Sequence, residues 1–187
     1  MLEAPAGGGV PGARAGKLRL FVGGDAAVVE HHRPLPEVLA DPQRITHVGG
    51  HGAGYLTKLL VNLLWFGQAI ATAEALLLAR AGIDLDVLRQ ALMDSAASSA
   101  FIRSSLGALL AGDYMTGFGL DHCCEELTTV TALGREHDVP LELSALVERI
   151  HQRALTRYGP TDGELLAVAL LEKKPGSGCA TALREGR

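Results

Sequence analysis

One uninterrupted run of residues constrains the fold of this 187-residue chain more than any other feature. Residues 55–81 contain no proline and no cluster of turn-forming residues, and Gly82 follows at a position where helices commonly end. The run predicts a single helix about 40 Å long, because an α-helix rises about 1.5 Å per residue. Apolar residues occupy nearly every face of this helix, so we expect other helices to surround it, from this chain or from a partner.

The most apolar part of the run, residues 59–73, is not expected to cross a membrane. It carries three polar side chains and is bracketed by Lys58 and Glu74. A bilayer needs about 20 consecutive apolar residues, and this segment is shorter. It therefore predicts a helix buried in protein, and no membrane partner is expected.

Shorter helical patterns fill the chain after this long helix. They are predicted over residues 84–96, 98–110, 120–137, 143–158 and 162–172. Residue types that begin or end helices lie at their boundaries: Asp84, Ser98 or Ser99, Gly112, Pro140 and Asp162. The Pro-Gly-Ser-Gly sequence at residues 175–178 then predicts a disordered tail over residues 175–187.

The first fifty residues differ in character, because short β-type runs alternate there with turn residues. Strands are predicted over residues 2–6, 17–22 and 45–48, and Asp25 is suited to cap a short helix over residues 26–31. Three strands with so little chain between them cannot form a sheet with both faces covered. We therefore interpret this part as the last section of a larger α/β domain.

The composition excludes several classes of protein. Apolar residues make up 48% of the chain and charged residues 20%, which is not the composition of a disordered chain. The net charge is −4, and the clustered cations that phosphate contacts need are missing, so no nucleic-acid partner is expected. Three cysteines are too few for a disulfide framework, and this favours a reducing compartment, the cytoplasm.

The first candidate site is the glycine-rich run at residues 49–54 together with Lys58 and Asn62. Glycines after a strand let a ligand approach the backbone, and the N–H groups of a helix start attract anions. Lys58 and Asn62 are four residues apart and share one helix face, where a desolvated lysine can act as a general acid or base. The alternative is that Lys58 extends into solvent while Asn62 bonds to the backbone. The spacing matches neither a P-loop nor, for residues 49–54, a dinucleotide fingerprint.

Two further groups of residues are candidates for ligand binding. Consecutive bare amides at Gly7, Gly8 and Gly9 can form an anion-binding nest, and a flexible turn is an equally good interpretation. His122, Cys123 and Cys124, with His137, lack the spacing of a zinc site, since adjacent helical side chains diverge by about 100°. Core packing is expected for the two cysteines, and no metal site is predicted.

Several ordered motifs resemble those of the β-hydroxyacid dehydrogenases, the family of 3-hydroxyisobutyrate dehydrogenase, tartronate semialdehyde reductase and 6-phosphogluconate dehydrogenase. Residues 3–10 (Glu-Ala-Pro-Ala-Gly-Gly-Gly-Val) are similar to the substrate motif Asp-Ala-Pro-Val-Ser-Gly-Gly, and residues 16–25 to the strand that follows it. Residues 47–62 resemble the catalytic signature G-x-G-x-x-x-K-x-x-x-N through Gly52, Gly54, Lys58 and Asn62. The resemblance covers nearly the whole chain.

The resemblance implies a mainly α fold. An all-helical domain is built around one long buried helix, and a few β-strands of an incomplete Rossmann-type domain precede it. We expect the remnant of the cofactor domain at residues 1–50 and the helical substrate and dimerisation domain at residues 51–174. A homodimer through the helical domain is expected, because the long helix carries more apolar surface than a lone chain of this size can cover.

The resemblance also implies functional roles. Lys58 would take the proton from a substrate hydroxyl while hydride passes from the same carbon to NAD or NADP, and Asn62 would hold the hydroxyl or carboxylate. The amides of Gly7, Gly8 and Gly9 would bind the carboxylate of a small hydroxy acid. The family's cofactor fingerprint and the residue that discriminates NAD from NADP are expected upstream of Met1. The chain alone is therefore expected to be inactive.

Two substitutions within the chain depart from the family pattern. Gly7 replaces the serine of the substrate motif, and Glu125-Glu126 stands where a Lys-Asp pair faces the nicotinamide in the family. The leading hypothesis is a part of an NAD(P)-dependent 3-hydroxyacid dehydrogenase. Two alternatives remain: a non-catalytic helical dimerisation module, and an imine or other carbonyl reductase, which the presence of Lys58 disfavours.

Overall fold

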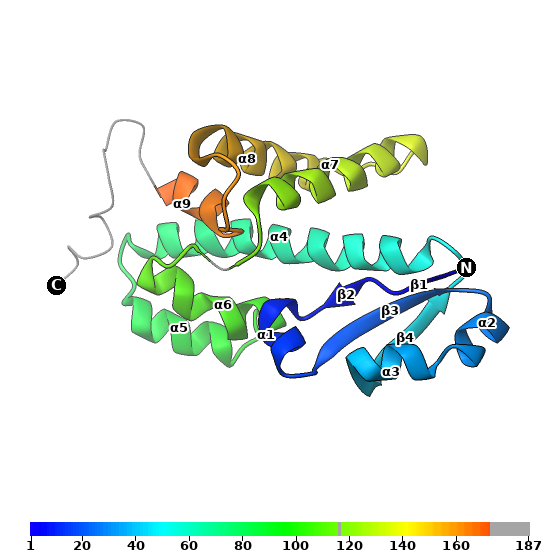
Figure 1. Ribbon diagram of the computed structural model, residues 1–187. Helices are drawn as coiled ribbons and strands as arrows, with labels where there is room; N and C mark the ends of the chain where they lie inside the picture. The colour runs from blue at the N-terminus through cyan, green and yellow to red at the C-terminus, as the bar shows by residue number, and fades with distance from the viewer. Residues whose placement is uncertain (116, 173–187) are drawn as a thin grey trace. The chain divides into compact units, whose positions relative to one another are not determined.

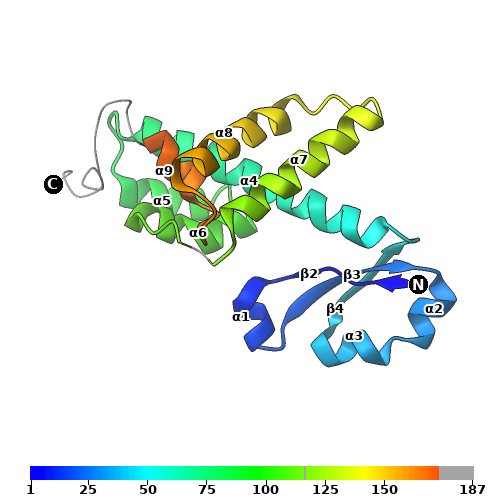
Figure 2. The ribbon, with the colours of Figure 1, turned by 45° about the horizontal axis from the view of Figure 1, so that its top comes forward.

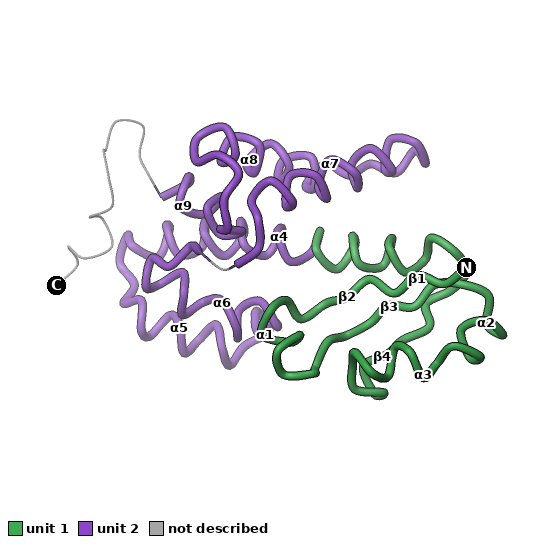
Figure 3. Tube along the Cα trace, viewed as in Figure 1, with its two compact units in different colours: residues 1–63 green, residues 64–187 purple. Residues whose placement is uncertain are grey.

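The computed structural model describes residues 1–115 and 117–172 (Figure 1). It separates into two compact units, residues 1–63 and the residues from 64 onward, coloured differently in Figure 3. The division falls inside the longest helix, α4 (Ala53–Ala79). The first unit contains the small sheet and the second is helical, so the predicted fold class is confirmed.

The sheet of the first unit is built around one strand, β3 (Leu18–Gly24). Two short strands, β1 (Leu2–Glu3) and β2 (Ala6–Gly7), pair antiparallel with successive parts of β3, while β4 (Ala40–Gly49) pairs parallel with it. Opposite edges of β3 are used, because Leu20 pairs with Ala6 in β2 and with Ile45 in β4. Leu20, Val22 and Ala40 form the buried apolar cluster of this unit.

Three short helices connect the strands of the first unit: α1 (Gly9–Arg14), α2 (Ala26–His31) and α3 (Pro34–Leu39). The predicted cap of α2 is confirmed, since Asp25 Oδ1 accepts hydrogen bonds from the backbone N–H groups of Ala27 and Val28 at 2.9 and 3.3 Å. Helices α1 and α3 were not predicted. Each contains proline, and α3 begins with one, a position that costs no intrahelical hydrogen bond.

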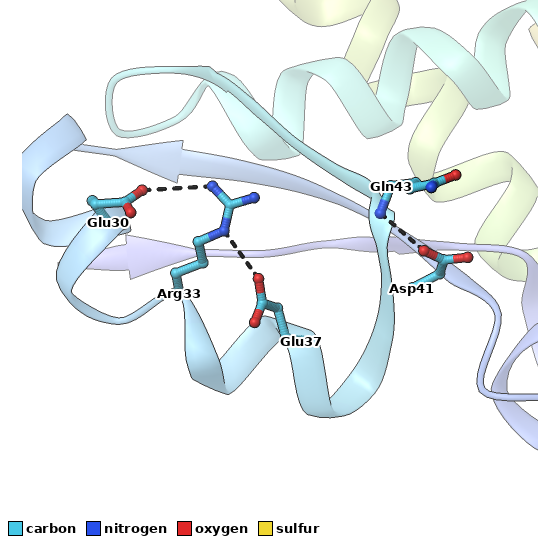
Figure 4. Close-up of polar contacts among 5 residues, drawn as sticks. All are labelled: Glu30, Arg33, Glu37, Asp41 and Gln43. Atoms are coloured by element: carbon cyan, nitrogen blue, oxygen red, sulfur yellow. Dashed lines mark hydrogen bonds and ion pairs between the residues drawn. The ribbon is translucent and has the colours of Figure 1, made fainter.

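Polar contacts stabilise the turn between α2 and α3 and the beginning of β4 (Figure 4). Arg33 Nε donates to Glu37 Oε1 at 3.0 Å, and the Arg33 guanidinium lies 3.6 Å from Glu30 Oε2. Asp41 Oδ1 accepts a hydrogen bond from the backbone N–H of Gln43 at 2.9 Å. These exposed contacts each contribute little to stability, and they fix the local path of the chain.

The long helix α4 was predicted within two residues at each end. One side of its second half is buried, with Phe66, Ala69 and Ala73 almost inaccessible, whereas Leu78, and Leu56 and Leu64 in the first half, are exposed. By length and composition α4 is long and apolar enough to cross a bilayer. The expectation drawn from residues 59–73 alone therefore underestimated the length of the apolar helix. The core helix of a soluble protein passes the same test, and the side of α4 that carries Phe66, Ala69 and Ala73 is buried in this way.

Five helices follow in the described part of the second unit, and the caps predicted from the sequence define the ends of the first two. Asp84 caps α5 (Leu85–Met93), Ser99 caps α6 (Ala100–Ala111), and Gly112 ends α6 in a left-handed conformation. The remaining helices are α7 (Leu120–Glu136), α8 (Glu142–Tyr158) and α9 (Leu166–Glu172). Figure 2 shows α7 and α8 side by side, and Thr128 and Thr131 on α7 both donate to the carboxylate of Glu148 on α8.

The second unit differs from the sequence predictions at the start of its last helix and agrees with them at its two cysteines. The prediction that Asp162 caps the last helix was wrong, because Asp162 forms a bridge with Gly119 and α9 begins at Leu166. Cys123 and Cys124 are buried in α7, which confirms their core packing. The tail predicted over residues 175–187 lies outside the described residues.

Candidate functional site

The residues of both sequence motifs lie in the first unit. Gly7 ends β2, Gly8 and Gly9 lead into α1, and the run at residues 49–54 connects β4 to α4. Lys58 and Asn62 follow one and two turns further along α4. The unit thus carries every residue that the sequence proposed for catalysis or substrate binding.

The carboxylate of Glu3 joins the two motifs. Glu3 lies in β1 at the start of the first motif and is buried. Its Oε1 accepts a hydrogen bond from the backbone N–H of Gly54 at 2.7 Å, and its Oε2 lies 3.2 Å from Nδ1 of His51. Burial by itself raises the pKa of Glu3, but the amides of Gly54, Gly52 and Tyr55, together with His51, lower that pKa below its usual value. Glu3 is therefore held as a carboxylate.

Close approach of backbones explains the glycine at position 54. A Cβ atom at Gly54 would lie 2.6 Å from the carbonyl oxygen of Phe21, and one at Gly23 would lie 2.8 Å from the nitrogen of Gly54. Contacts this short with backbone atoms leave no room for a side chain. Gly52 requires glycine for a different reason, because its φ of +93° is one that other residues rarely adopt. The glycines of the second motif thus allow α4 to begin directly against β3.

Lys58 and Asn62 form a hydrogen-bonded pair on α4. Lys58 Nζ donates to Asn62 Oδ1 at 2.6 Å, and both side chains are half-buried. The geometry differs from the alternative in which Lys58 reaches only solvent. Gly54, Lys58 and Asn62 are spaced four residues apart, so they lie along one face of the helix. The face that receives the carboxylate of Glu3 at Gly54 is therefore the face that carries the amine and the amide.

The turn at Gly7, Gly8 and Gly9 uses the freedom of glycine at two positions. Gly8 and Gly9 have φ values of +112° and +57°, and the carbonyl of Gly8 accepts a hydrogen bond from Gly12 at 3.0 Å. Gly7, Gly9 and Gly12 have the spacing of G-x-G-x-x-G, but α1 is six residues long and the next strand, β3, runs antiparallel to β2. This turn is therefore not a Rossmann fingerprint, which requires a parallel β–α–β unit. Anion binding there stays a prediction.

Sequence reasoning assigned no role to Glu3 or to His47. His47 Nε2 lies 3.0 Å from the carbonyl oxygen of Gly24 and 2.9 Å from that of Gly49, and it donates because both partners accept. It thereby joins the carboxyl ends of the parallel strands β3 and β4. A signal for Glu3 was available, since it is the single acidic residue before Asp25.

A groove between α7 and α8 in the second unit is acidic. Its lining residues are Asp121, Cys124, Glu125, Thr128, Thr129, Gln152 and Leu155. Burial raises the pKa of the Cys124 thiol to about 11, so the thiol stays protonated and is a poor nucleophile or metal ligand. Within residues 1–115 and 117–172 no group of three His, Cys, Asp or Glu side chains is placed to hold a metal ion.

Family comparisons match both parts of the chain. Residues 52–171 match a family described as "NAD-binding of NADP-dependent 3-hydroxyisobutyrate dehydrogenase". The chain belongs to the β-hydroxyacid dehydrogenase family. Residues 1–49 match the NAD-binding domain of 6-phosphogluconate dehydrogenase, so the first unit's sheet also has its counterpart among these dehydrogenases.

Individual relatives agree with this assignment. The chain is 31% identical over 153 residues to 2-(hydroxymethyl)glutarate dehydrogenase of Eubacterium barkeri, covering 81% of this chain and 50% of that one. It is 41% identical over 118 residues to 2-hydroxy-3-oxopropionate reductase of Escherichia coli, covering 63% of this chain and 40% of that one. A crystal structure of 3-hydroxyisobutyrate dehydrogenase from Salmonella typhimurium matches with a TM-score of 0.79 and 25% identity, covering 91% of this chain and 60% of that one. This β-hydroxyacid dehydrogenase chain thus spans about half the length of the curated relatives it matches.

The cofactor of the family is NAD or NADP, and the described residues do not provide a site for its pyrophosphate. Pyrophosphate binds in this kind of fold at a helix start that follows a parallel strand. The parallel crossover in the described part of the chain runs from β3 through α2 and α3 to β4. The start of α2 is already occupied by the carboxylate of Asp25, which bonds its first N–H groups. No residue described here is therefore assigned to the pyrophosphate.

Proposed function

We propose that this chain supplies the acid–base and substrate-binding residues of an NAD(P)-dependent dehydrogenase acting on a small 3-hydroxy acid. The observation that carries the proposal is the pair of Lys58 and Asn62, joined at 2.6 Å on the helix face that begins at Gly54. A cation beside an amide on one face of a helix suits a substrate that carries a hydroxyl and a carboxylate.

Lys58 acts as the proton carrier in this proposal. In the oxidation of a hydroxy acid, the neutral amine of Lys58 accepts the hydroxyl proton as the carbonyl forms; in reduction its ammonium returns that proton to the oxygen. The hydride itself passes to nicotinamide, which supplies that chemistry when bound. Asn62 fixes the direction of the amine through Oδ1, and its N–H groups are donors suited to a substrate oxygen.

The glycine turn after β2 binds the carboxylate end of the substrate. The exposed Gly8 and Gly9 carry no side chain, so a carboxylate can approach their backbone N–H groups closely at this turn. Gly7 offers no hydroxyl, so the backbone amides replace the serine donor of the family motif. A three-carbon or four-carbon acid with a hydroxyl at the third carbon is the substrate class that these groups suit.

Assembly and location complete the proposal. A homodimer is supported by the exposed leucines of α4, which include Leu56, Leu60 and Leu64 at four-residue spacing. The cytoplasm is supported by the unpaired thiols of Cys123 and Cys124. No nucleic-acid or membrane partner is proposed.

A titration of the 187-residue chain with three small ligands tests the proposed site. NMR would follow the Lys58 side chain and the amides of Gly8 and Gly9, with Lys17 as the reference lysine. We expect 3-hydroxyisobutyrate to shift all three signals, isobutyrate to shift the glycine amides alone, and isobutanol to shift neither glycine. Equal shifts of the Lys58 and Lys17 signals with every ligand would contradict the proposed substrate site. The chain alone is expected to show no NAD(P)-dependent turnover, and robust oxidation by it would contradict the assignment of the cofactor site.

A further inference from the structure

The contact between Glu3 and the start of α4 requires a carboxylate to be buried, which costs free energy. A buried carboxylate loses its hydration, and only one of its oxygens, Oε1, has a well-formed hydrogen bond in the described structure. The other, Oε2, is buried beside His51, whose side chain is largely exposed. A neutral side chain of similar size would fill the same space without burying a charge. The carboxylate therefore calls for an explanation beyond packing.

The first turn of α4 supplies that explanation. Its leading N–H groups have no partners within the helix, and the Asn, Asp, Ser or Thr that commonly caps a helix is missing from residues 49–54. Glu3 reaches the N–H of Gly54 from a strand 51 residues earlier in the chain and caps the helix from outside. A carboxylate is also the favoured charge at a helix start.

Glu3 fixes more than the stability of this turn. The Cβ positions of Gly54 and Gly23 show that α4 and β3 touch through their backbones there, so this close contact lies directly beside the bond to Glu3. Holding Gly54 sets the rotation of α4 about its own axis. Lys58 and Asn62 lie one and two turns beyond on the same face, so their directions are set by the same contact.

We propose that Glu3 is a positioning residue, which holds the first turn of α4 so that Lys58 and Asn62 project in one fixed direction. This inference rests on the proposed function only in taking Lys58 as the acid–base group; the positioning itself is a property of the fold. Glu3 touches neither substrate nor cofactor in this role. Its substitution is therefore expected to loosen α4 locally while β3 stays ordered.

Amide hydrogen exchange and lysine labelling of the 187-residue chain test this role without any assay of turnover. The variants are Glu3→Ala, which removes the acceptor, and Glu3→Gln, which keeps an acceptor oxygen but not the charge. Glu30→Gln removes an exposed carboxylate of the same unit and is the matched control. Exchange is followed at Gly54 and Leu56–Lys58 and, as an internal reference, at Phe21 and Val22 of β3. Acylation of Lys58 is measured as a ratio to Lys17.

We expect Glu3→Ala to accelerate exchange at Gly54 and in the following turn by about tenfold or more, with β3 unchanged. The Lys58 to Lys17 labelling ratio is expected to rise several-fold. Glu3→Gln is expected to show the same pattern with a smaller amplitude, because it partly restores the bond to Gly54. If Glu3→Ala does not fold, the exchange and labelling of Glu3→Gln test the positioning role instead.

Two results would overturn the positioning role. One is equal acceleration in α4 and β3, which would make Glu3 a general stabiliser of the unit. The other is exchange in α4 that matches the Glu30→Gln control. The proposed function fails on a different observation, an unresponsive Lys58 in the ligand titration, so the two failures are distinguishable.

Discussion

The carboxylate of Glu3 accepts a hydrogen bond from the backbone N–H of Gly54 at 2.7 Å, across 51 residues of sequence. This contact joins the glycine-rich motif after β1 to the helix that carries Lys58 and Asn62. It also explains why the second motif contains Gly54, since a side chain there would collide with the backbone of β3 and with Glu3. The glycine at position 54 therefore serves the close packing of α4 against β3 in this fold.

Substitution of Gly54 tests this packing. Gly54→Ala is expected to lower the free energy of unfolding by about 1–3 kcal/mol, because the new methyl group would lie 2.6 Å from the carbonyl oxygen of Phe21. Gly67, in the same helix, has open space around its Cβ position, so Gly67→Ala is the matched control. Gly67→Ala is expected to raise stability by about 0.5–1 kcal/mol. Denaturant unfolding measures both, and two changes of the same sign would contradict the close approach.

The free energy of unfolding is expected to fall at acid pH because His151 is buried. Burial lowers the pKa of His151, opposed only in part by the hydrogen bond between its Nδ1 and the carbonyl of Val147. The unfolded chain therefore binds a proton more readily than the folded one. Stability is complete above about pH 6.5 and falls as pH drops below that value, by at most about 1.4 kcal/mol per pH unit.

Thermal unfolding between pH 8 and 5, in roughly half-unit steps, measures this dependence. His151→Leu is expected to flatten the profile in this range, because the buried site would no longer titrate. His137→Gln changes an exposed histidine and is expected to keep the wild-type slope. An unchanged slope in His151→Leu would show that another group is responsible.

The exposed leucines of α4 predict the oligomeric state. We expect a dimer by light scattering at micromolar concentration and a monomer for Leu60→Glu, which places a charge in the middle of the exposed leucine row. Val38→Glu changes a more exposed apolar residue, on α3, and is expected to leave the dimer intact. A monomeric wild-type chain would contradict the prediction.

Short-range signals in the sequence predicted most elements of the fold. Asp25, Asp84 and Ser99 cap the helices that follow them because each cap acts within three residues. The pairing of Lys58 with Asn62 was accessible for the same reason, since residues four apart on a helix are neighbours. Helices α1 and α3 were missed because glycine and proline, which usually mark turns, lie inside them.

The contacts that join separate segments were not accessible in this way. Glu3 and Gly54 are brought together by the pairing of β1 with β3 and by the approach of α4 to the same strand. His47 bonds to Gly24 through the parallel pairing of β4 with β3. No local pattern encodes such a contact. It follows only when the strand order and register are known.

The most direct test of the account is the turnover of a chimera in which the residues of Escherichia coli 2-hydroxy-3-oxopropionate reductase that precede its match to this chain are placed before residue 1. We expect NAD(P)-dependent turnover of a small 3-hydroxy acid, a kcat lower by about 10²–10⁴-fold in Lys58→Ala, and no change in Lys17→Ala. A kcat that survives Lys58→Ala would contradict the role of Lys58. A folded chimera without turnover would favour a non-catalytic helical module.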